Sequence, residues 1–127
     1  SFPVRDLEAS MRFYVEVLGA RRGRVRDDWV DVHLRGHQIT LQWKPDEVID
    51  EPGCRHFGVV LPWEEWEAEV ERLPRAEVRS APTISFEGTP QEQVKLYLGD
   101  PDGNVIELKA YRDVAAALEI APESETP

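Results

Sequence analysis

The chain has 127 residues, of which 41% are hydrophobic and 31% are charged, and this length and composition suit one compact domain with a modest core. The formal net charge of −10 disfavours nucleic acid and anionic membrane surfaces as partners, because both would repel the chain. The single cysteine excludes an internal disulfide framework, and no apolar stretch is long enough for a signal peptide or a bilayer span. We therefore expect a cytoplasmic protein with neither a nucleic-acid nor a membrane partner.

The first third of the chain predicts one strand, one helix and three more strands. Asp6 is placed to cap the helix, and Gly19 is placed to end it. Arg35 and Gly36 form the tight turn of a hairpin between the last two strands. The expected elements are a strand at 2–4, a helix at 6–19, and strands at 21–27, 28–36 and 37–44.

The same order of elements begins again after a connector rich in Pro, Gly and acidic residues. The expected elements are a strand at 55–61, a helix at 62–73, and strands at 76–86, 93–98 and 104–111. The two units lie about 56 residues apart, so the sequence contains an internal repeat. We predict an α+β fold of one domain, 1–120, with two βαβββ modules at 1–45 and 54–112, a linker at 46–53 and a disordered acidic tail at 121–127.

Side chains in a strand alternate between the two faces of the sheet, so each module has one apolar and one polar face. In the first module the polar face is predicted to carry Trp29, Asp31, His33, Gln38, Thr40 and Gln42. In the second module it is predicted to carry Lys95, Tyr97, Glu107 and Lys109, while Leu96, Leu98, Ile106 and Leu108 face the helix. If the two modules form one curved mixed sheet, these polar faces line a concave cleft for a small molecule. For Glu107 alone, simple exposure to water is the alternative.

The doubled βαβββ unit, opened by "FPVRDLEASMRFYVEVLG" and closed by "DPDGNVIELKAY", resembles the vicinal oxygen chelate superfamily over nearly the whole chain. This family includes glyoxalase I, bleomycin-resistance proteins and type I extradiol dioxygenases. The stretch "YLGDPDGNVIE" is similar to the dioxygenase signature Y-x-x-D-P-x-G-x-x-x-E. The resemblance implies that Glu107 is a metal ligand, that Tyr97 is a catalytic hydrogen-bond donor, and that the protein forms a homodimer.

The resemblance also implies a second metal ligand at the histidine that opens the second module, which is His56 in "CRHFGVVL". The third ligand of the family is an equivalent histidine in the first module, and the repeat places that position at or just before Ser1. Two histidines and one carboxylate on one face of the metal are typical of Fe(II) sites. We therefore expect a divalent metal, with Fe2+ favoured and Mn2+, Zn2+ or Ni2+ as alternatives.

Two departures from the family patterns bear on the reaction. The glyoxalase branch has a glutamate in the first module where this chain has Thr40, which is a poor substitute for a carboxylate ligand. The longer dioxygenase signature has an acid-base histidine shortly before the tyrosine, and residues 87–94 contain none. His33, which lies on the predicted polar face, is a candidate to replace this group or to orient the substrate. An ordinary structural histidine is the competing interpretation.

The other candidate residues have stronger structural interpretations. His37 follows the predicted hairpin turn, and Cys54 at the start of a strand is expected to pack rather than to bind metal. Trp63 and Trp66 have helical spacing and are expected to cover the sheet. The basic cluster just after the first helix is expected to form a solvated or salt-bridged strand edge; it comprises Arg21, Arg22, Arg24 and Arg26.

Three functions follow from these expectations. The first is a metal-dependent enzyme of dioxygenase type that binds a substrate through two adjacent oxygens, with a glyoxalase-type lyase or isomerase as the variant reaction. The second is a binding protein similar to bleomycin-resistance proteins, which use the same cleft to sequester a ligand without a protein-bound metal. The third is an interaction module with a degenerate cleft.

Overall fold

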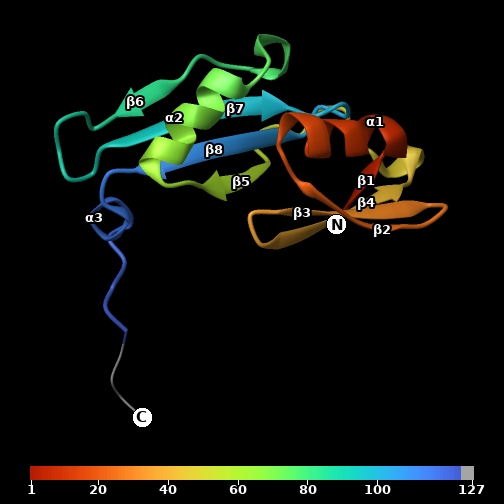
Figure 1. Cartoon of the computed structure of the whole chain (residues 1–127), viewed down its shortest axis with the longest axis horizontal. Coiled ribbons are helices and arrows are strands. Elements are labelled where there is room, and N and C mark those ends of the chain that lie inside the picture. The colour runs from red at the N-terminus through yellow and green to blue at the C-terminus, as the bar shows by residue number, and fades with distance from the viewer. Residues whose placement is uncertain (124–127) are drawn as a thin grey trace.

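The structure is a computed structural model that describes residues 1–123 and contains two βαβββ modules (Figure 1). The elements of the first module are β1 (Phe2–Val4), α1 (Leu7–Arg12), a π-helical segment η1 (Phe13–Val17), β2 (Arg21–Val25), β3 (Trp29–Leu34) and β4 (His37–Trp43). A short 3-10 turn, η2 (Pro45–Glu47), opens the connector to the second module.

The second module repeats this order and is followed by a short helix that the sequence analysis did not predict. Its elements are β5 (His56–Val60), α2 (Trp63–Arg72), a 3-10 turn η3 (Arg75–Glu77), β6 (Thr83–Ser85), β7 (Gln93–Gly99) and β8 (Val105–Tyr111), with α3 (Val114–Leu118) after them. Residues 121–123 form no helix or strand. The rest of the predicted disordered tail, 124–127, lies outside the described residues.

Each module forms a four-stranded mixed sheet with the same strand order. The orders are β1-β4-β3-β2 and β5-β8-β7-β6, in which β1 pairs with β4 and β5 pairs with β8 in parallel. The other neighbouring strands are antiparallel. The predicted fold class is therefore confirmed. Each module has its own hydrogen-bonded sheet of four strands.

The first helix begins and ends where the sequence predicts. The side chain of Asp6 accepts a hydrogen bond of 3.0 Å from the backbone nitrogen of Ala9, as an N-cap should. The second half of the helix widens into a π-helical turn, in which the backbone nitrogen of Leu18 donates to the carbonyl of Phe13 at 3.1 Å. Gly19 then takes a φ of +76°, which lets the chain leave the helix sharply.

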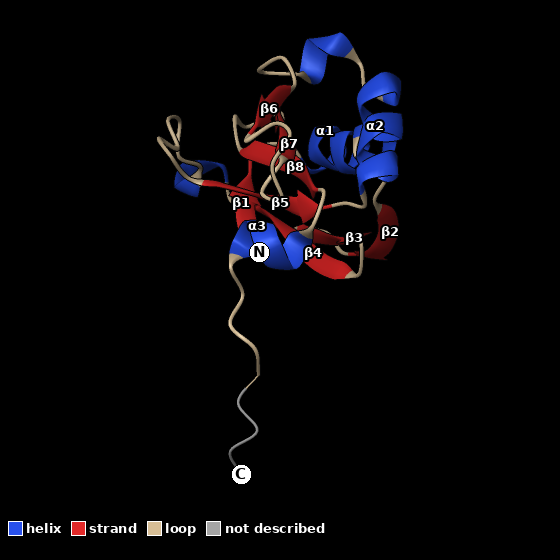
Figure 2. Ribbon diagram, turned by 90° about the vertical axis from the view of Figure 1, so that its left-hand side faces the viewer, coloured by secondary structure: helices blue, strands red, loops and turns tan. Residues whose placement is uncertain are grey.

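The core lies between each sheet and its helix. Figures 1 and 2 show α1 and α2 on the same side of the molecule, each next to the sheet of its own module. The side chains predicted to face the helices are buried, with exposed fractions of 4% or less for Val30, Val32, Leu34, Leu41, Leu96, Leu98, Ile106 and Leu108. Trp66 is buried as expected, and its indole nitrogen donates to the carbonyl of Leu108 at 2.8 Å. Strand alternation therefore predicted the core correctly.

Asp31 differs from a typical polar-face residue, because its side chain is almost fully buried. Arg24 donates a hydrogen bond to its Oδ2 at 2.6 Å, and Thr40 donates to its Oδ1 at 3.1 Å. The hydrogen bond from Arg24 is the main cause of a lowered pKa of Asp31, which therefore stays ionised in this network. On this part of the first module's polar face, Arg24 and Thr40 therefore occupy the carboxylate of Asp31, which is not free to bind a ligand.

The strand predicted over residues 76–86 is much shorter in the structure. Only Thr83–Ser85 form β6, and the preceding segment contains the turn η3 and a single bridge between Val78 and Leu98. Pro82 has no backbone N–H to donate to the neighbouring strand, and Pro74 starts the 3-10 turn. These prolines explain why the segment follows the sheet edge without continuous pairing.

The turn between β7 and β8 joins the two modules. Asp100 in this turn accepts a hydrogen bond of 2.8 Å from the hydroxyl of Tyr14 in the first module, and both side chains are buried. The backbone nitrogen of Arg5 donates to Asp102 at 3.2 Å. Burial raises the pKa of Asp102, whose Oδ2 has no hydrogen-bond partner among the described residues. The "DPDGN" motif therefore has a structural role at the module interface.

No helix within residues 1–123 is both long enough and apolar enough to cross a membrane.

Candidate metal centre

The predicted site residues of the second module lie in adjacent rows on the polar face of its sheet. His56 on β5 pairs with Val105 on β8, and Glu107 on β8 pairs with Tyr97 on β7. Gly58 is the partner of Glu107 on β5, and a Cβ atom built on Gly58 would lie 1.8 Å from the carbonyl oxygen of Glu107. Only glycine permits this close approach of the two backbones.

The side chains of His56 and Glu107 converge on this face. The Nε2 atom of His56 lies 3.9 Å from Oε1 of Glu107, whose side chain is 9% exposed. The other ring nitrogen, Nδ1, lies 2.9 Å from the backbone carbonyl oxygen of Cys54. Because a carbonyl oxygen only accepts, this contact places a proton on Nδ1, and in the neutral ring Nε2 keeps its lone pair for a metal ion. The expectation that Cys54 packs is wrong, because its side chain is exposed, and only its backbone carbonyl takes part in this contact.

Lys109 contacts the same carboxylate oxygen of Glu107 that His56 approaches. Its Nζ lies 3.4 Å from the same Oε1 atom. Burial lowers the pKa of Lys109, but the negative charge of Glu107 and a hydrogen bond with Tyr111 outweigh burial, so the pKa is raised overall. The ammonium group therefore remains charged and partly neutralises Glu107. Strand alternation predicts Lys109 on this face, but nothing in the sequence indicated its contact with Glu107.

Tyr97 completes the cluster. Its ring lies edge-on to the ring of His56, with centroids 5.6 Å apart. A hydrogen bond to Glu107 is the largest cause of a raised pKa for Tyr97, with desolvation second. The phenol thus stays protonated at neutral pH and can donate a hydrogen bond.

The donor set of His56 and Glu107 fits a divalent metal ion as a pair of ligands. Metal–nitrogen and metal–oxygen bonds of about 2.0–2.2 Å place two ligand atoms of one tetrahedral ion about 3.4 Å apart. The separation of 3.9 Å is slightly longer, so a small side-chain movement would bring both donors onto one ion. No group of three or more His, Cys, Asp or Glu side chains in the described part of the chain is arranged to hold a metal ion. Within the described residues, His56 and Glu107 therefore have no third His, Cys, Asp or Glu side chain placed to bind the same ion.

Two cavities flank His56. One has a volume of about 400 Å3 and is lined by residues that include His56, Tyr97 and Val105. The other, of about 260 Å3, lies between β1, the connector and β5, where the rings of Phe2 and Phe57 contact each other at an angle of 46° with centroids 5.7 Å apart. No residue of β2, β3 or β4 lines either cavity.

His33 is the one predicted site residue that the structure does not bring to this cluster. It pairs with Arg21 across β2 and β3 and lines a different cavity, of about 540 Å3, together with Arg22 and Arg35. Within one chain, His33 therefore lies apart from His56 and Glu107. Its predicted role in catalysis stays a prediction.

Solved structures with similar folds support this assignment of the architecture. A glyoxalase/bleomycin resistance protein/dioxygenase from Alicyclobacillus acidocaldarius is 27% identical, with a TM-score of 0.76 and coverage of 89% of each chain. A protein of the same description from Nocardioides is 26% identical, with a TM-score of 0.61 and coverage of 86% of this chain and 78% of that one. The fosfomycin resistance protein FosX from Listeria monocytogenes is 18% identical, with a TM-score of 0.69 and coverage of 86% and 87%, and shows likeness of fold alone.

A search among curated proteins finds no match to this chain. The profile of one family, in contrast, matches residues 1–108, which include the first module and the second module as far as the middle of β8, just after Glu107. The match agrees with the repeated strand order and with the signature that contains Tyr97 and Glu107. The chain therefore belongs to the glyoxalase/bleomycin resistance protein/dioxygenase superfamily.

Proposed function

We propose that this protein is a metal-dependent enzyme that acts on a small molecule with two adjacent oxygen atoms, and that its reaction is of the dioxygenase type. The observation that carries the proposal is the approach of His56 Nε2 to Glu107 Oε1 at 3.9 Å, with Nδ1 anchored on the Cys54 carbonyl. A divalent ion held by these residues would bind the substrate oxygens and act as a Lewis acid, with Fe2+ as the favoured metal for oxygen chemistry.

The residues around this pair have separate tasks in the proposal. Tyr97 would turn its single O–H from Glu107 and donate it to negative charge that develops on the substrate, since its raised pKa keeps the phenol protonated. Lys109 balances the charge of Glu107 before metal binds, because its ammonium group contacts the same carboxylate oxygen. The glyoxalase-type variant uses the same residues for isomerisation without a redox step.

Turnover by the metal-loaded protein tests the proposal. Full-length protein loaded with Fe2+, Mn2+, Zn2+ or Ni2+ is incubated with catechols under oxygen, and in parallel with hemithioacetals of α-ketoaldehydes. We expect turnover in the first series with Fe2+, and a fall in kcat of about 100-fold for Tyr97→Phe with little change in KM. Activity only on hemithioacetals would replace the dioxygenase assignment with the glyoxalase one. No turnover in any combination would contradict the enzyme proposal.

The position of Lys109 favours a second candidate, a binding protein that works without a metal. An ammonium group 3.4 Å from Oε1 already supplies Glu107 with a cation from within the chain. In this version the polar face sequesters a small molecule through Tyr97, Lys109 and His56. Tight ligand binding by metal-free protein, unchanged when metal is added, would support this candidate over the enzyme.

We further propose a cytoplasmic homodimer in which the polar face of the first module of one copy covers the candidate metal centre of the other. The support is that no residue of β2, β3 or β4 lines the cavities beside His56 within one chain. Such a dimer would bring His33 and Gln42 near the centre. Light scattering on the full-length protein should give the mass of two chains, and the mass of one chain would contradict the dimer.

A further inference from the structure

Two arginines of unassigned role lie beside the candidate metal centre. Arg55 and Arg79 line the cavity of about 400 Å3 that also contains His56 and Tyr97; its other lining residues are Gly53, Cys54, Ser80 and Val105. We propose that Arg79, with Arg55, binds an oxyanion group on the substrate, either a carboxylate or a phosphoryl group, while the adjacent oxygens of the substrate face His56 and Glu107. The inference deepens the proposed function and rests on it for the position of the adjacent oxygens.

Arg79 is held on the polar face by a close contact with a glycine. Gly99 and Tyr97 are two residues apart on β7 and therefore face the same side of the sheet. A Cβ atom built on Gly99 would lie 2.2 Å from Nε and 2.9 Å from Cζ of Arg79. The guanidinium group thus occupies the space that a side chain at position 99 would fill. This gives a reason for a glycine inside a strand, where glycine otherwise weakens pairing.

The backbone fixes the segment that carries Arg79. Its nitrogen donates to the carbonyl of Tyr97 at 2.8 Å, and the preceding residue, Val78, forms the bridge to Leu98. Arg79 therefore approaches from the edge of β7, and its side chain extends back across that strand at Gly99. A guanidinium group placed in this way is oriented in advance for two parallel hydrogen bonds to an oxyanion.

The guanidinium group of Arg79 lies over Gly99, and the strand register places Gly99 in the same row as His56. Gly99 pairs with Val105, and Val105 pairs with His56, so the three positions lie side by side on β7, β8 and β5. Two strand spacings amount to about 10 Å between the backbones at 99 and 56. Val105 provides an apolar floor between the guanidinium and the imidazole. One small ring or short chain with an oxyanion at its far end would fit this row.

The charges around this cavity are unusual for the chain. Acidic residues outnumber basic ones by 25 to 15, yet the residues that line the cavity include two arginines and no Asp or Glu. Among residues 1–123, no carboxylate lies within ion-pair distance of Arg55 or Arg79. Glu107 in the next row is matched by Lys109. The cavity is therefore positively charged, and a bound divalent ion would increase that charge.

Paired ligands that differ in one carboxylate test the inference. Calorimetry on full-length protein loaded with Zn2+, which avoids turnover, compares catechol with 3,4-dihydroxybenzoate. We expect 3,4-dihydroxybenzoate to bind about tenfold more tightly or better. Arg79→Gln should abolish the preference and leave the affinity for catechol unchanged. Gly99→Ala should do the same by displacing the guanidinium. Inorganic phosphate is then added as a competitor of 3,4-dihydroxybenzoate. Competition indicates a site that also accepts phosphoryl groups, and no competition indicates a site restricted to carboxylates.

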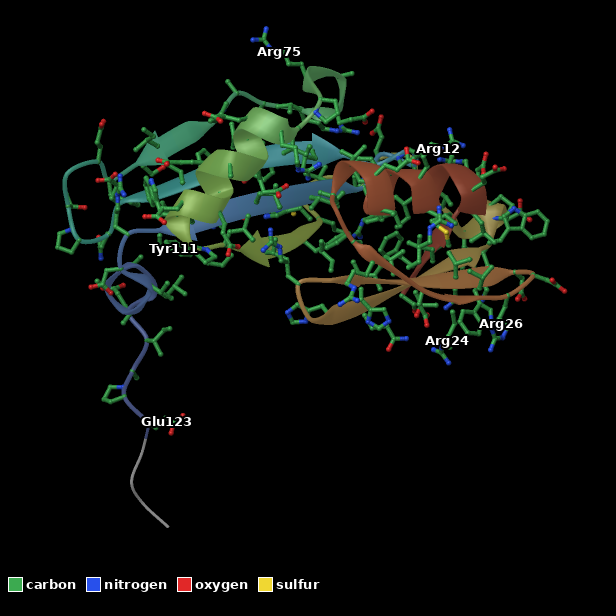
Figure 3. The ribbon with its side chains drawn as sticks, in the orientation of Figure 1. Arg12, Arg24, Arg26, Arg75, Tyr111 and Glu123 are labelled. Atoms are coloured by element: carbon green, nitrogen blue, oxygen red, sulfur yellow. The ribbon has the colours of Figure 1, made fainter. Side chains whose placement is uncertain are left out.

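Arg75→Gln is the matched control, because Arg75 lies in the same connecting segment but points away from the body of the molecule (Figure 3). It should keep the preference for 3,4-dihydroxybenzoate. Equal affinity of the wild type for both diols, or a preference that survives Arg79→Gln, would overturn the inference. Benzoate binding to metal-free protein isolates the oxyanion site. Suppose that Arg79→Gln abolishes benzoate binding, while the affinity for catechol is the same with and without Zn2+. The inference then holds and the metal-dependent function fails.

Discussion

Asp100→Ala is expected to lower the free energy of unfolding by about 3 kcal/mol or more and the melting temperature by about 10 °C or more. The side chain of Asp100 accepts four hydrogen bonds: one from the Tyr14 hydroxyl, two from Asn104 and one from the backbone of Asp102. Alanine would leave the buried hydroxyl of Tyr14 without an acceptor. It would also remove the one side-chain hydrogen bond within residues 1–123 that links α1 and η1 to the β7–β8 turn.

Two control variants separate this interface from general sensitivity to mutation. Tyr14→Phe removes only the hydrogen bond from Tyr14 to Asp100 and should cost about 1.5 kcal/mol. Asp27→Ala changes an exposed aspartate between β2 and β3 and should have an effect within about 0.5 kcal/mol. Urea unfolding monitored by circular dichroism measures the free energy of unfolding of all three variants. A loss for Asp100→Ala no larger than that for Asp27→Ala would show that the turn does not hold the modules together.

His56→Ala and Glu107→Ala are each expected to weaken divalent-metal binding by about 100-fold or more. Each substitution removes one of the two donors whose atoms lie 3.9 Å apart, and the remaining one cannot hold the ion alone. Glu107→Ala also leaves the ammonium group of Lys109 without its partner, which adds repulsion toward a cation. Calorimetric titration of full-length protein with Mn2+ or Zn2+ gives the dissociation constants.

His37→Ala is the matched control for His56→Ala, because His37 is an exposed histidine at the start of β4. It should bind metal as the wild type does. Lys109→Met should move the affinity the other way and strengthen metal binding, since it removes a competing positive charge from Glu107. Equal metal affinity for His56→Ala and the wild type would show that any bound ion lies at another site.

Most of the fold could be predicted from the sequence because its signals are local. The alternation of apolar residues in β3, β4, β7 and β8 assigned the buried faces, and Asp6 and Gly19 marked the ends of the first helix. The expectation that His56 and Glu107 lie near each other came from the family resemblance. These features depend on residues that are close in sequence, or on the order of elements, which the repeat makes the same in both modules.

The features that were missed depend on contacts between distant residues. Asp31 is buried because Arg24 and Thr40 satisfy its carboxylate, which alternation alone cannot show. The position of the Arg79 side chain depends on the space that Gly99 leaves by having no side chain, and a glycine inside a strand was the one available signal. The short β6 was overestimated because β-branched residues on both sides of Pro82 suggested a continuous strand.

The most direct test of the central claim is anomalous diffraction from crystals of the full-length protein grown with Zn2+ or Mn2+. We predict one strong anomalous peak on the polar face of the second module, within about 2.0–2.2 Å of Nε2 of His56 and of a carboxylate oxygen of Glu107, with Lys109 displaced from that oxygen. A fully occupied peak elsewhere on the chain, or no peak beside these two residues at a saturating metal concentration, would contradict the account.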